Sequence, residues 1–289
     1  MSETQALNSL AGLDFVKMTG SGNDFIVVDN RGAGVPPALM SRLARALCPR
    51  RLSVGADGLI LLRPSHRVDS VRGPVDFAWD FFNADGSSAE MCGNGGRCAA
   101  RFARDRGIAG DQMLFDTLAG PIRAWVGGGV VKLELVKPQG FYRGLTLEID
   151  GNRLTLDGVN TGVPHAVITV DDIDAAAVRE IGRRVRFHPH FAPAGTNVNF
   201  AASQDGELWV RTYERGVEDE TLACGTGAVA AALTAGRALG LDSPVKVRVK
   251  SGETLLVHFN AAADEVFLEG GAAYVYEGNL HPEAWSWMA

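Results

Sequence analysis

The chain has 289 residues, of which 46% are hydrophobic and 21% are charged, a composition typical of a globular protein with room for two domains. Its formal net charge of −6, with no long run of lysine or arginine, argues against a nucleic-acid partner, and no stretch approaches the roughly 20 apolar residues of a membrane span. Four cysteines are too few for a disulfide framework in a chain of this length, so we expect reduced thiols and a cytoplasmic protein.

The first half of the chain is predicted to combine strands with two helices. Residues 1–12 carry neither a basic start nor an apolar stretch, so we expect a short disordered lead and not a secretory signal. Apolar runs between glycine-rich turns predict strands, and apolar residues at helical spacing predict helices. The strands are expected at 15–18, 25–29, 59–63 and 76–82, with more between 113 and 155, and the helices at 36–47 and 96–105.

The second half repeats this order of elements with little residue identity. Strands are expected at 166–170, 197–201 and 207–213, and helices at 174–183 and 227–240. In each half a polar loop leads to a Cys-Gly-x-Gly sequence and then to an alanine-rich helix. We therefore predict an α+β fold of two similar domains, each with one main helix, that face each other across a cleft.

Two cysteines, Cys92 and Cys224, each stand directly before a predicted helix. The glycine-rich turn there leaves unpaired backbone N–H groups at the positive end of the helix dipole, which lower the pKa of a thiol and stabilise a bound anion. Cys48 and Cys98 lie in or at the end of helices, among alanine and leucine, and are expected to pack in the core. Two reactive settings in matching positions suggest an acid/base pair that serves one substrate from opposite sides.

Such a pair suits a reaction at the α-carbon of an amino acid. Inversion there requires one group to remove a weakly acidic proton from one face and another group to deliver a proton to the other face. A thiolate opposite a thiol does both, and the helix N–H groups can stabilise the charge of the carbanion. The scheme requires no cofactor, and we expect none. We also expect no metal, because two cysteines at C-x5-C spacing, without a second pair, make a poor zinc site.

Several segments carry a resemblance to a known family, and they are residues 18–25, 82–87, 91–98, 162–165, 195–199, 213–216, 220–221 and 223–227. In these segments the chain resembles the diaminopimelate epimerase family, and the resemblance extends over almost its whole length. It implies a cofactor-independent isomerase that converts LL-diaminopimelate to the meso form in lysine and cell-wall precursor biosynthesis. It also implies two pseudo-symmetric domains, each a curved, mostly antiparallel sheet or barrel around a central helix, with the active site in the cleft. We expect these domains at residues 13–136 together with 271–289, and at 137–270.

By this resemblance, Cys92 and Cys224 are the catalytic base and acid, and His165 and Glu214 support catalysis. Glu214 would bind the α-ammonium group of the substrate, and Arg215 would pair with its distal carboxylate. A lone Glu-Arg pair is usually a solvated ion pair, but the bidentate fit of a guanidinium to a carboxylate gives Arg215 a reason to face a substrate. His165 would lie close to the thiols. Because it follows a proline, it is equally consistent with a loop histidine whose hydrogen bonds are satisfied locally.

The other substrate-binding residues are implied by the same resemblance. Three asparagines would hold the distal amino and carboxylate groups, and four residues would offer backbone N–H groups to the reacting carboxylate. The asparagines are Asn23, Asn83 and Asn197, and the N–H donors are Gly93, Asn94, Gly225 and Thr226. An asparagine in a glycine turn is also favoured by its tolerance of left-handed backbone, so the role of Asn23 depends on the motif. The family often has asparagine where this chain has Val163 and glutamine where it has Gly58, which leaves room for a related substrate.

Three other functions fit parts of the sequence. A racemase of the same fold that acts on another amino acid without pyridoxal phosphate would share the cysteine pair. Residues 225–230 match a G-x-G-x-x-A dinucleotide-binding pattern, but the polar segment before them lacks the buried strand that this pattern needs. A non-catalytic amino-acid-binding protein would need the binding residues but not two thiols. The expected partners are the small molecule diaminopimelate and, as one option, a second copy of the chain in a homodimer.

Overall fold

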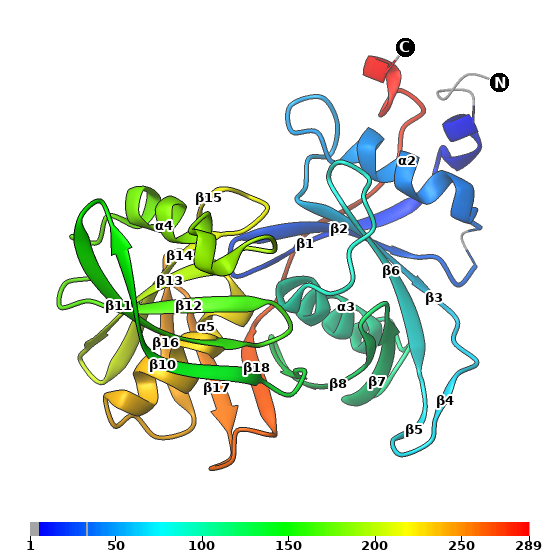
Figure 1. The fold of residues 1–289 in the computed structure, drawn as a ribbon. Coiled ribbons are helices and arrows are strands. Elements are labelled where there is room, and N and C mark those ends of the chain that lie inside the picture. The colour runs from blue at the N-terminus through cyan, green and yellow to red at the C-terminus, as the bar shows by residue number, and fades with distance from the viewer. Residues whose placement is uncertain (1–5, 33, 289) are drawn as a thin grey trace. The chain divides into compact units, whose positions relative to one another are not determined.

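The computed structural model describes residues 6–32 and 34–288, and it consists of two compact units. Unit 1 is formed by residues 1–133 and 271–289, and unit 2 by residues 134–270. Both ends of the chain therefore belong to unit 1, and unit 2 is inserted between them in sequence (Figure 1). None of the helices in the described part of the chain combines the length and the apolar character that a membrane crossing requires.

Unit 1 is built on a mostly antiparallel sheet with the spatial order β19-β1-β2-β3-β6-β7-β8-β9. The β2–β3 and β6–β7 pairs are parallel, and the other neighbouring pairs are antiparallel. The strands are β1 (Asp14–Gly20), β2 (Asn23–Asp29), β3 (Gly58–Arg63), β6 (Phe77–Asn83), β7 (Gln112–Thr117), β8 (Gly120–Gly127), β9 (Val130–Glu134) and β19 (Ala273–Asn279), with a separate hairpin of β4 (Val68–Asp69) and β5 (Gly73–Pro74).

Strand β3 is buried on both faces, which explains its unbroken apolar sequence. Leu59 and Leu61 belong to the apolar cluster that contains helix α2 (Pro37–Leu47). The intervening Ile60 faces the other way, toward α3 (Gly93–Asp105), since its Cδ1 would lie 3.3 Å from a Cβ built on Gly95. The alternation of a strand thus supplies one apolar face to each helix.

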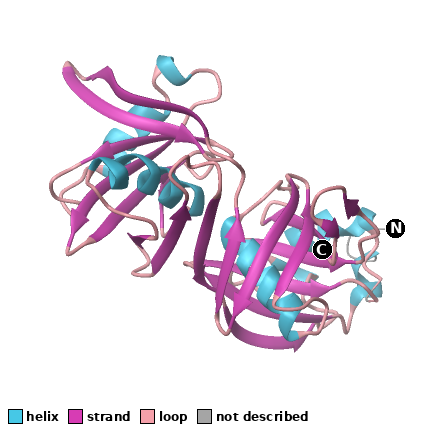
Figure 2. Ribbon diagram, turned by 90° about the horizontal axis from the view of Figure 1, so that it is seen from below, coloured by secondary structure: helices cyan, strands magenta, loops and turns pink. Residues whose placement is uncertain are grey.

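Helix α3 is the central helix of unit 1. Its residues 94–100 are buried without interruption, as expected of a helix enclosed by a sheet and not laid on a surface. Small residues allow this enclosure: a Cβ on Gly96 would lie only 2.9 Å from Cδ1 of Leu133. Figure 2 shows the helix within the strands of its unit. Short 3-10 turns lie near the chain ends, at Asn8–Leu10 and Ser286–Met288.

Unit 2 has the spatial strand order β10-β11-β12-β13-β14-β16-β17-β18, with the short β15 also beside β14. Its central helix is α5 (Gly225–Ala231), which continues as a π-helical turn (Ala232–Gly236) and packs among the valines of the sheet. The other elements are β10 (Gln139–Ile149), β11 (Asn152–Asn160), β12 (Pro164–Thr169), α4 (Val178–Arg186), a 3-10 turn (Pro189–Phe191), β13 (Asn197–Gln204), β14 (Glu207–Glu214), β15 (Asp219–Thr221), β16 (Val245–Val249), β17 (Thr254–Phe259) and β18 (Val266–Gly271).

The two units follow the same plan of strand pairing. Along each spatial order the neighbouring pairs are antiparallel, antiparallel, parallel, antiparallel, parallel, antiparallel and antiparallel. The first parallel pair is connected by α2 in unit 1 and by α4 in unit 2, and the second by α3 and by α5. The predicted α+β fold with two pseudo-symmetric halves is therefore confirmed.

Two expectations about individual segments are wrong. The predicted disordered lead fails for residues 6–12, because Leu7 and Leu10 are buried in the core with Trp285; residues 1–5 lie outside the described residues. The helix expected at 174–183 begins only at Val178. The side chain of Asp172 accepts from the backbone N–H groups of Asp174 and Ala175, which form a turn before the helix.

Candidate active site

Cys92 is the N-cap of the central helix of unit 1. Its backbone is extended (φ −140°, ψ 117°), and its Sγ accepts a hydrogen bond from the backbone N–H of Gly95 at 3.5 Å. The N–H of Gly96 donates to the Cys92 carbonyl at 2.8 Å and closes the first helical turn. The half-buried thiol thus lies at the positive end of a helix of 13 residues, where a thiolate is stabilised.

Cys224 is the N-cap of the central helix of unit 2, in the corresponding position. Its Sγ lies 3.5 Å from Oγ1 of Thr226, and its carbonyl accepts from the N–H of Ala228 at 2.9 Å. The Thr226 carbonyl in turn accepts from the Thr161 hydroxyl at 3.1 Å, which fixes the turn against the segment between β11 and β12. Because Cys224 is buried, little water has to be removed from it when a substrate binds beside it.

The two remaining cysteines are in a different setting. Cys48 and Cys98 are buried in the core of unit 1, as predicted. Burial raises the pKa of the Cys48 thiol to about 12, so it stays protonated and inert. Position at a helix N-cap therefore distinguishes one pair of cysteines from the other.

Asn94 and Asn23 are joined beside Cys92. The buried Asn94 donates through Nδ2 to Oδ1 of Asn23 at 2.7 Å, and Asn23 donates through Nδ2 to Oδ2 of Asp57 at 2.9 Å. Arg97, which is fully buried, donates to Oδ1 of Asn94 at 3.0 Å and to the hydroxyl of Ser21. This chain of hydrogen bonds ties the turn between β1 and β2 to the first turn of α3.

A cluster of charges supports the same turn. Asp24 pairs with Lys17 at 2.7 Å and with Arg50 at 2.6 Å, and Arg50 also reaches Asp57 at 2.9 Å. Burial alone would raise the pKa of Asp24, but its hydrogen bonds to Arg50 and Lys17 outweigh burial and hold that pKa at about 2. The carboxylate is therefore ionised at any working pH. Its Oδ1 accepts from the backbone N–H of Asp57 at 3.1 Å, and the Asp57 carboxylate in turn accepts from Asn23.

Asn83 lies apart from this network. It is exposed, its Nδ2 donates to Oγ of Ser87 at 3.0 Å, and its backbone N–H donates to the Ser87 carbonyl at 2.9 Å. Across the sheet it is paired with Gly58. A Cβ at position 58 would lie 2.6 Å from the ring of Phe81 and 2.7 Å from the carbonyl oxygen of Phe82, so this backbone admits only glycine there.

Glu214, Arg215 and Asn197 come together in unit 2. Asn197 is buried; its Oδ1 accepts from the backbone N–H of Arg215 at 2.8 Å, and its Nδ2 donates to the Pro164 carbonyl at 3.2 Å. Arg215 donates through Nη1 to the Ala194 carbonyl at 3.2 Å. Burial raises the pKa of Glu214, and a hydrogen bond from Thr221 at 2.9 Å partly opposes that rise.

His165 is buried and forms part of a small polar network. Its Nδ1 lies 3.1 Å from Nδ2 of Asn199, and the Thr212 hydroxyl donates to Oδ1 of Asn199 at 2.9 Å. Burial first, and the charge of Arg215 second, lower the pKa of His165 to about 3. Sequence reasoning missed Asn199 and Thr212. The sequence did contain a signal for Asn199, because it lies two positions after the predicted site residue Asn197 and therefore shares a face of the strand with it.

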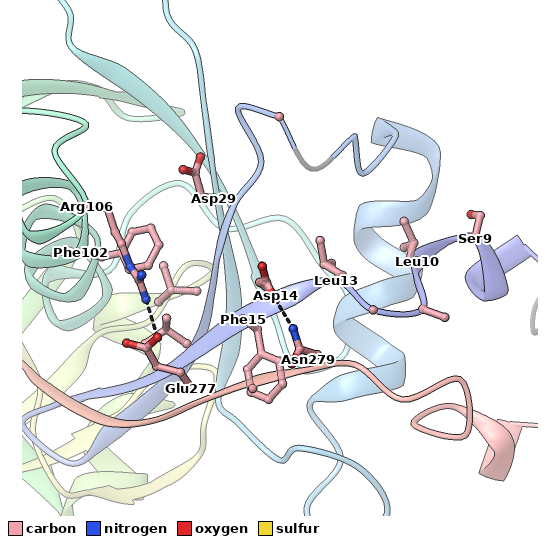
Figure 3. A pocket seen from close by; sticks show the side chains of 16 residues that line it. Ser9, Leu10, Leu13, Asp14, Phe15, Asp29, Phe102, Arg106, Glu277 and Asn279 are labelled. Atoms are coloured by element: carbon pink, nitrogen blue, oxygen red, sulfur yellow. Dashed lines mark hydrogen bonds and ion pairs between the residues drawn. The ribbon is translucent and has the colours of Figure 1, made fainter.

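A cavity of about 840 Å³ in unit 1 is lined by none of the predicted site residues (Figure 3). Its lining includes two polar pairs, Arg106 with Glu277 at 2.7 Å and Asn279 with Asp14. Arg106 caps the C-terminal end of α3, which at 1.5 Å per residue places it about 20 Å from Cys92. Among residues 6–32 and 34–288, no three His, Cys, Asp or Glu side chains gather in a way that could hold a metal ion.

The family described as diaminopimelate epimerase matches this chain over residues 15–128 and 158–275, which is most of its length and includes both cysteine motifs. The chain belongs to the diaminopimelate epimerase family. The resemblance predicted from the sequence motifs is thereby confirmed.

Individual relatives cover almost the whole chain. It is 46% identical over 282 residues to the diaminopimelate epimerase of Aquifex aeolicus, covering 94% of this chain and 99% of the relative. The diaminopimelate epimerase of Hydrogenobaculum is 44% identical over 279 residues, covering 92% and 98%.

Solved structures of lower identity share the fold. A PhzF-family phenazine biosynthesis protein of Bacillus anthracis superposes with a TM-score of 0.66 at 16% identity, covering 93% of this chain and 98% of the other. A hydroxyproline epimerase of Agrobacterium vitis superposes with a TM-score of 0.64 at 18% identity, covering 93% and 92%. The architecture seen in the diaminopimelate epimerase family is thus shared with more distant proteins.

Proposed function

We propose that this protein is a diaminopimelate epimerase that inverts one α-carbon of LL-2,6-diaminopimelate to give the meso form, in lysine and peptidoglycan precursor biosynthesis. Cys92 and Cys224 act as the acid/base pair. One observation carries the proposal: within a chain of this family, the two cysteines cap equivalent central helices in two units of identical pairing plan. A base and an acid that exchange roles with the direction of reaction call for such matched settings.

The helix N-termini supply the electrostatics of the reaction. In the first turn of each helix, backbone N–H groups have no partner within the helix. Those of Gly93 and Asn94 in unit 1, and of Gly225 and Thr226 in unit 2, are available to the reacting carboxylate and to the charge that develops on the carbanion. The scheme requires no cofactor, because the thiolate and thiol supply the proton transfers.

The remaining side chains bind the two ends of the substrate. The carboxylate of Glu214 takes the α-ammonium group, and the guanidinium of Arg215 pairs with the distal carboxylate. Asn23, Asn83 and Asn197 hold the distal amino and carboxylate groups. Asn23 and Asn197 are supported for this role by being oriented through their own hydrogen bonds, to Asp57 and to the backbone of Arg215. A cytosolic location and a homodimer stay predictions.

Turnover in deuterated water tests proton transfer directly. Inversion through a carbanion places a solvent deuteron at the α-carbon of the product, which mass spectrometry or NMR detects. We expect Cys92→Ala and Cys224→Ala each to lower turnover by about 10²–10⁴-fold or more, since each removes an acid/base group.

Cys48→Ala is the matched control, because it removes a buried thiol outside the site and is expected to leave turnover near the wild-type level. Product without solvent deuterium would contradict proton abstraction, and full turnover by either N-cap variant would contradict the cysteine pair.

A further inference from the structure

One ring nitrogen of His165 is hydrogen-bonded, and the other has no hydrogen-bond partner among the described residues. The residue lies at the start of β12 and is wholly buried. Nδ1 faces the amide of Asn199, whereas Nε2 is buried and has no hydrogen-bond partner among the described residues. Buried polar groups are almost always hydrogen-bonded in folded proteins, so a ring nitrogen in this state calls for an explanation.

The orientation of the Asn199 amide is fixed by its other contacts. Nδ2 donates to the backbone carbonyl of Ala166 at 3.0 Å, and a carbonyl can only accept. Oδ1 accepts from the hydroxyl of Thr212 at 2.9 Å. Exchanging the amide oxygen and nitrogen would set two acceptors against each other at Ala166. The NH₂ group therefore stands on the side of His165.

This orientation determines the tautomer of His165. An NH₂ group is a donor, so Nδ1 of His165 must be the acceptor of the 3.1 Å contact. A neutral imidazole whose Nδ1 accepts carries its proton on Nε2. Protonation of the ring would set an N–H of Nδ1 against the NH₂ of Asn199. The positive charge of the nearby Arg215 also disfavours a protonated, cationic ring. The other neighbouring group, the Tyr142 hydroxyl, lies 3.5 Å from the backbone carbonyl of His165 and not at its ring.

The network lies directly behind the Cys224 turn. A Cβ built on Gly227 would lie 2.3 Å from Oδ1 of Asn199, 3.2 Å from Oγ1 of Thr212 and 3.3 Å from Cβ of Cys224. On the other side, His165 is paired in register with Asn197 across β12 and β13. The unpartnered Nε2–H therefore belongs to the same part of unit 2 as the candidate catalytic thiol.

We propose that Asn199, held by Thr212, is a positioning residue that keeps His165 neutral with its proton on Nε2, and that this N–H donates to an anionic acceptor during the reaction while the ring takes no proton itself. The acceptor is either a carboxylate oxygen of the substrate or the thiolate of Cys224. This assignment rests on the proposed function, and it gives His165 the role of an electrostatic donor in place of a general base.

NMR of the intact enzyme labelled with ¹⁵N-histidine tests the tautomer without any reference to turnover. Long-range ¹H–¹⁵N correlations distinguish the protonated ring nitrogen from the acceptor nitrogen, and comparison with His165→Gln assigns the signal among the six histidines. We expect Nε2 to carry the proton and Nδ1 to remain an acceptor at every pH between 5.5 and 9. A proton on Nδ1, or protonation of the ring within that range, would overturn the proposal.

The same signal identifies the acceptor. A change of the Nε2–H resonance on saturation with diaminopimelate indicates the substrate carboxylate, and a change with pH in the free enzyme that is lost in Cys224→Ala indicates the thiolate. An Nε2–H signal unmoved in both experiments would refute the donor role. Deuterium incorporation by the same sample separates this failure from a failure of the proposed function, because it reports proton transfer whatever the state of His165.

Asn199→Asp tests the positioning residue. A carboxylate at this site is an acceptor, so we expect the His165 proton to move to Nδ1 and kcat to fall more than KM rises. If the tautomer in this variant stayed on Nε2, Asn199 would not be what sets it.

Discussion

Glu214 is the proposed binding residue whose environment has the most direct consequence for activity. Burial raises the pKa of its carboxyl, and the hydroxyl of Thr221, 2.9 Å from Oε2, stabilises the ionised form and lowers it again. A carboxyl that binds an ammonium group must be ionised. Activity that depends on Glu214 is therefore lost as the pH falls through its pKa, and because that pKa is raised, the loss begins at a higher pH than for an exposed glutamate.

Removal of the Thr221 hydroxyl tests this dependence. In Thr221→Val the ionised form of Glu214 loses a hydrogen bond, its pKa rises further, and the acidic limb of the kcat/KM profile moves to higher pH. Thr155→Val is the matched control, since the exposed Thr155 of the same unit has its hydroxyl 3.5 Å from that of Thr146, its partner across the strand pair. Superimposable acidic limbs in both variants would show that Glu214 is not the group that titrates.

At the scale of an element, the first turn of α5 depends on close approach at Gly227. The three side-chain atoms nearest to a Cβ at this position come from Asn199, Thr212 and Cys224. Cβ atoms are practically never found as near as the 2.3 Å calculated for Oδ1 of Asn199, so any larger residue must displace the amide, the turn or the cysteine. The glycine therefore fixes the distance between the Cys224 turn and the polar network behind it.

Gly227→Ala and Gly236→Ala form a matched pair at the two ends of the same helical segment. We expect Gly227→Ala to destabilise unit 2 by about 1–3 kcal/mol through overpacking and to lower kcat, because Cys224 moves. At Gly236 the nearest atom to a Cβ is 3.7 Å away, an ordinary contact, so alanine there is neutral or stabilises by up to about 1 kcal/mol. Denaturant unfolding and turnover of both variants measure the difference, and equal effects would refute a special role for residue 227.

The elements that sequence predicts best are those that local chemistry determines. A cysteine followed by Gly-x-Gly and an alanine-rich segment predicts a helix start, and both cysteines are indeed N-caps. The sequence predicts the start of α4 four residues too early, because the polar turn at Asp172 and the helix after it have the same spacing of apolar residues. Turn hydrogen bonds decided the boundary there.

Contacts between distant segments were beyond reach of sequence reasoning. Asn199 sits in a predicted strand, but its partners His165, Ala166 and Thr212 come from two neighbouring strands, and only the register brings them together. The same holds for Asp57, whose contact with Asn23 spans 34 residues. Residue types indicated which side chains could react, while the sheet determined which side chains hold them in place.

At the scale of the whole molecule, unit 1 is completed by both ends of the chain. Strand β19 pairs with β1, and Trp285 is fully buried in a cluster with Leu7 and Leu10. The indole Nε1 of Trp285 donates to Oδ1 of Asn8 at 2.9 Å across a sequence separation of 277 residues. Because unit 2 lies between these segments in sequence, the core of unit 1 closes only after residues 134–270 have also been made.

Trp285→Ala tests this closure. Removal of a fully buried tryptophan leaves a cavity and typically costs about 3–5 kcal/mol, so we expect a large loss of stability confined to unit 1. Trp287→Ala is the control two residues away. Trp287 is 39% exposed and its Nε1 donates to the Ala46 carbonyl at 3.2 Å, so about 1 kcal/mol or less is expected. Hydrogen exchange separates the units, because amides of β1 and β2 should lose protection in Trp285→Ala while those of β13 and β14 keep it.

Equal loss in both units would mean that they unfold as one, and protection unchanged everywhere would mean that the C-terminal segment merely covers a core that is already closed.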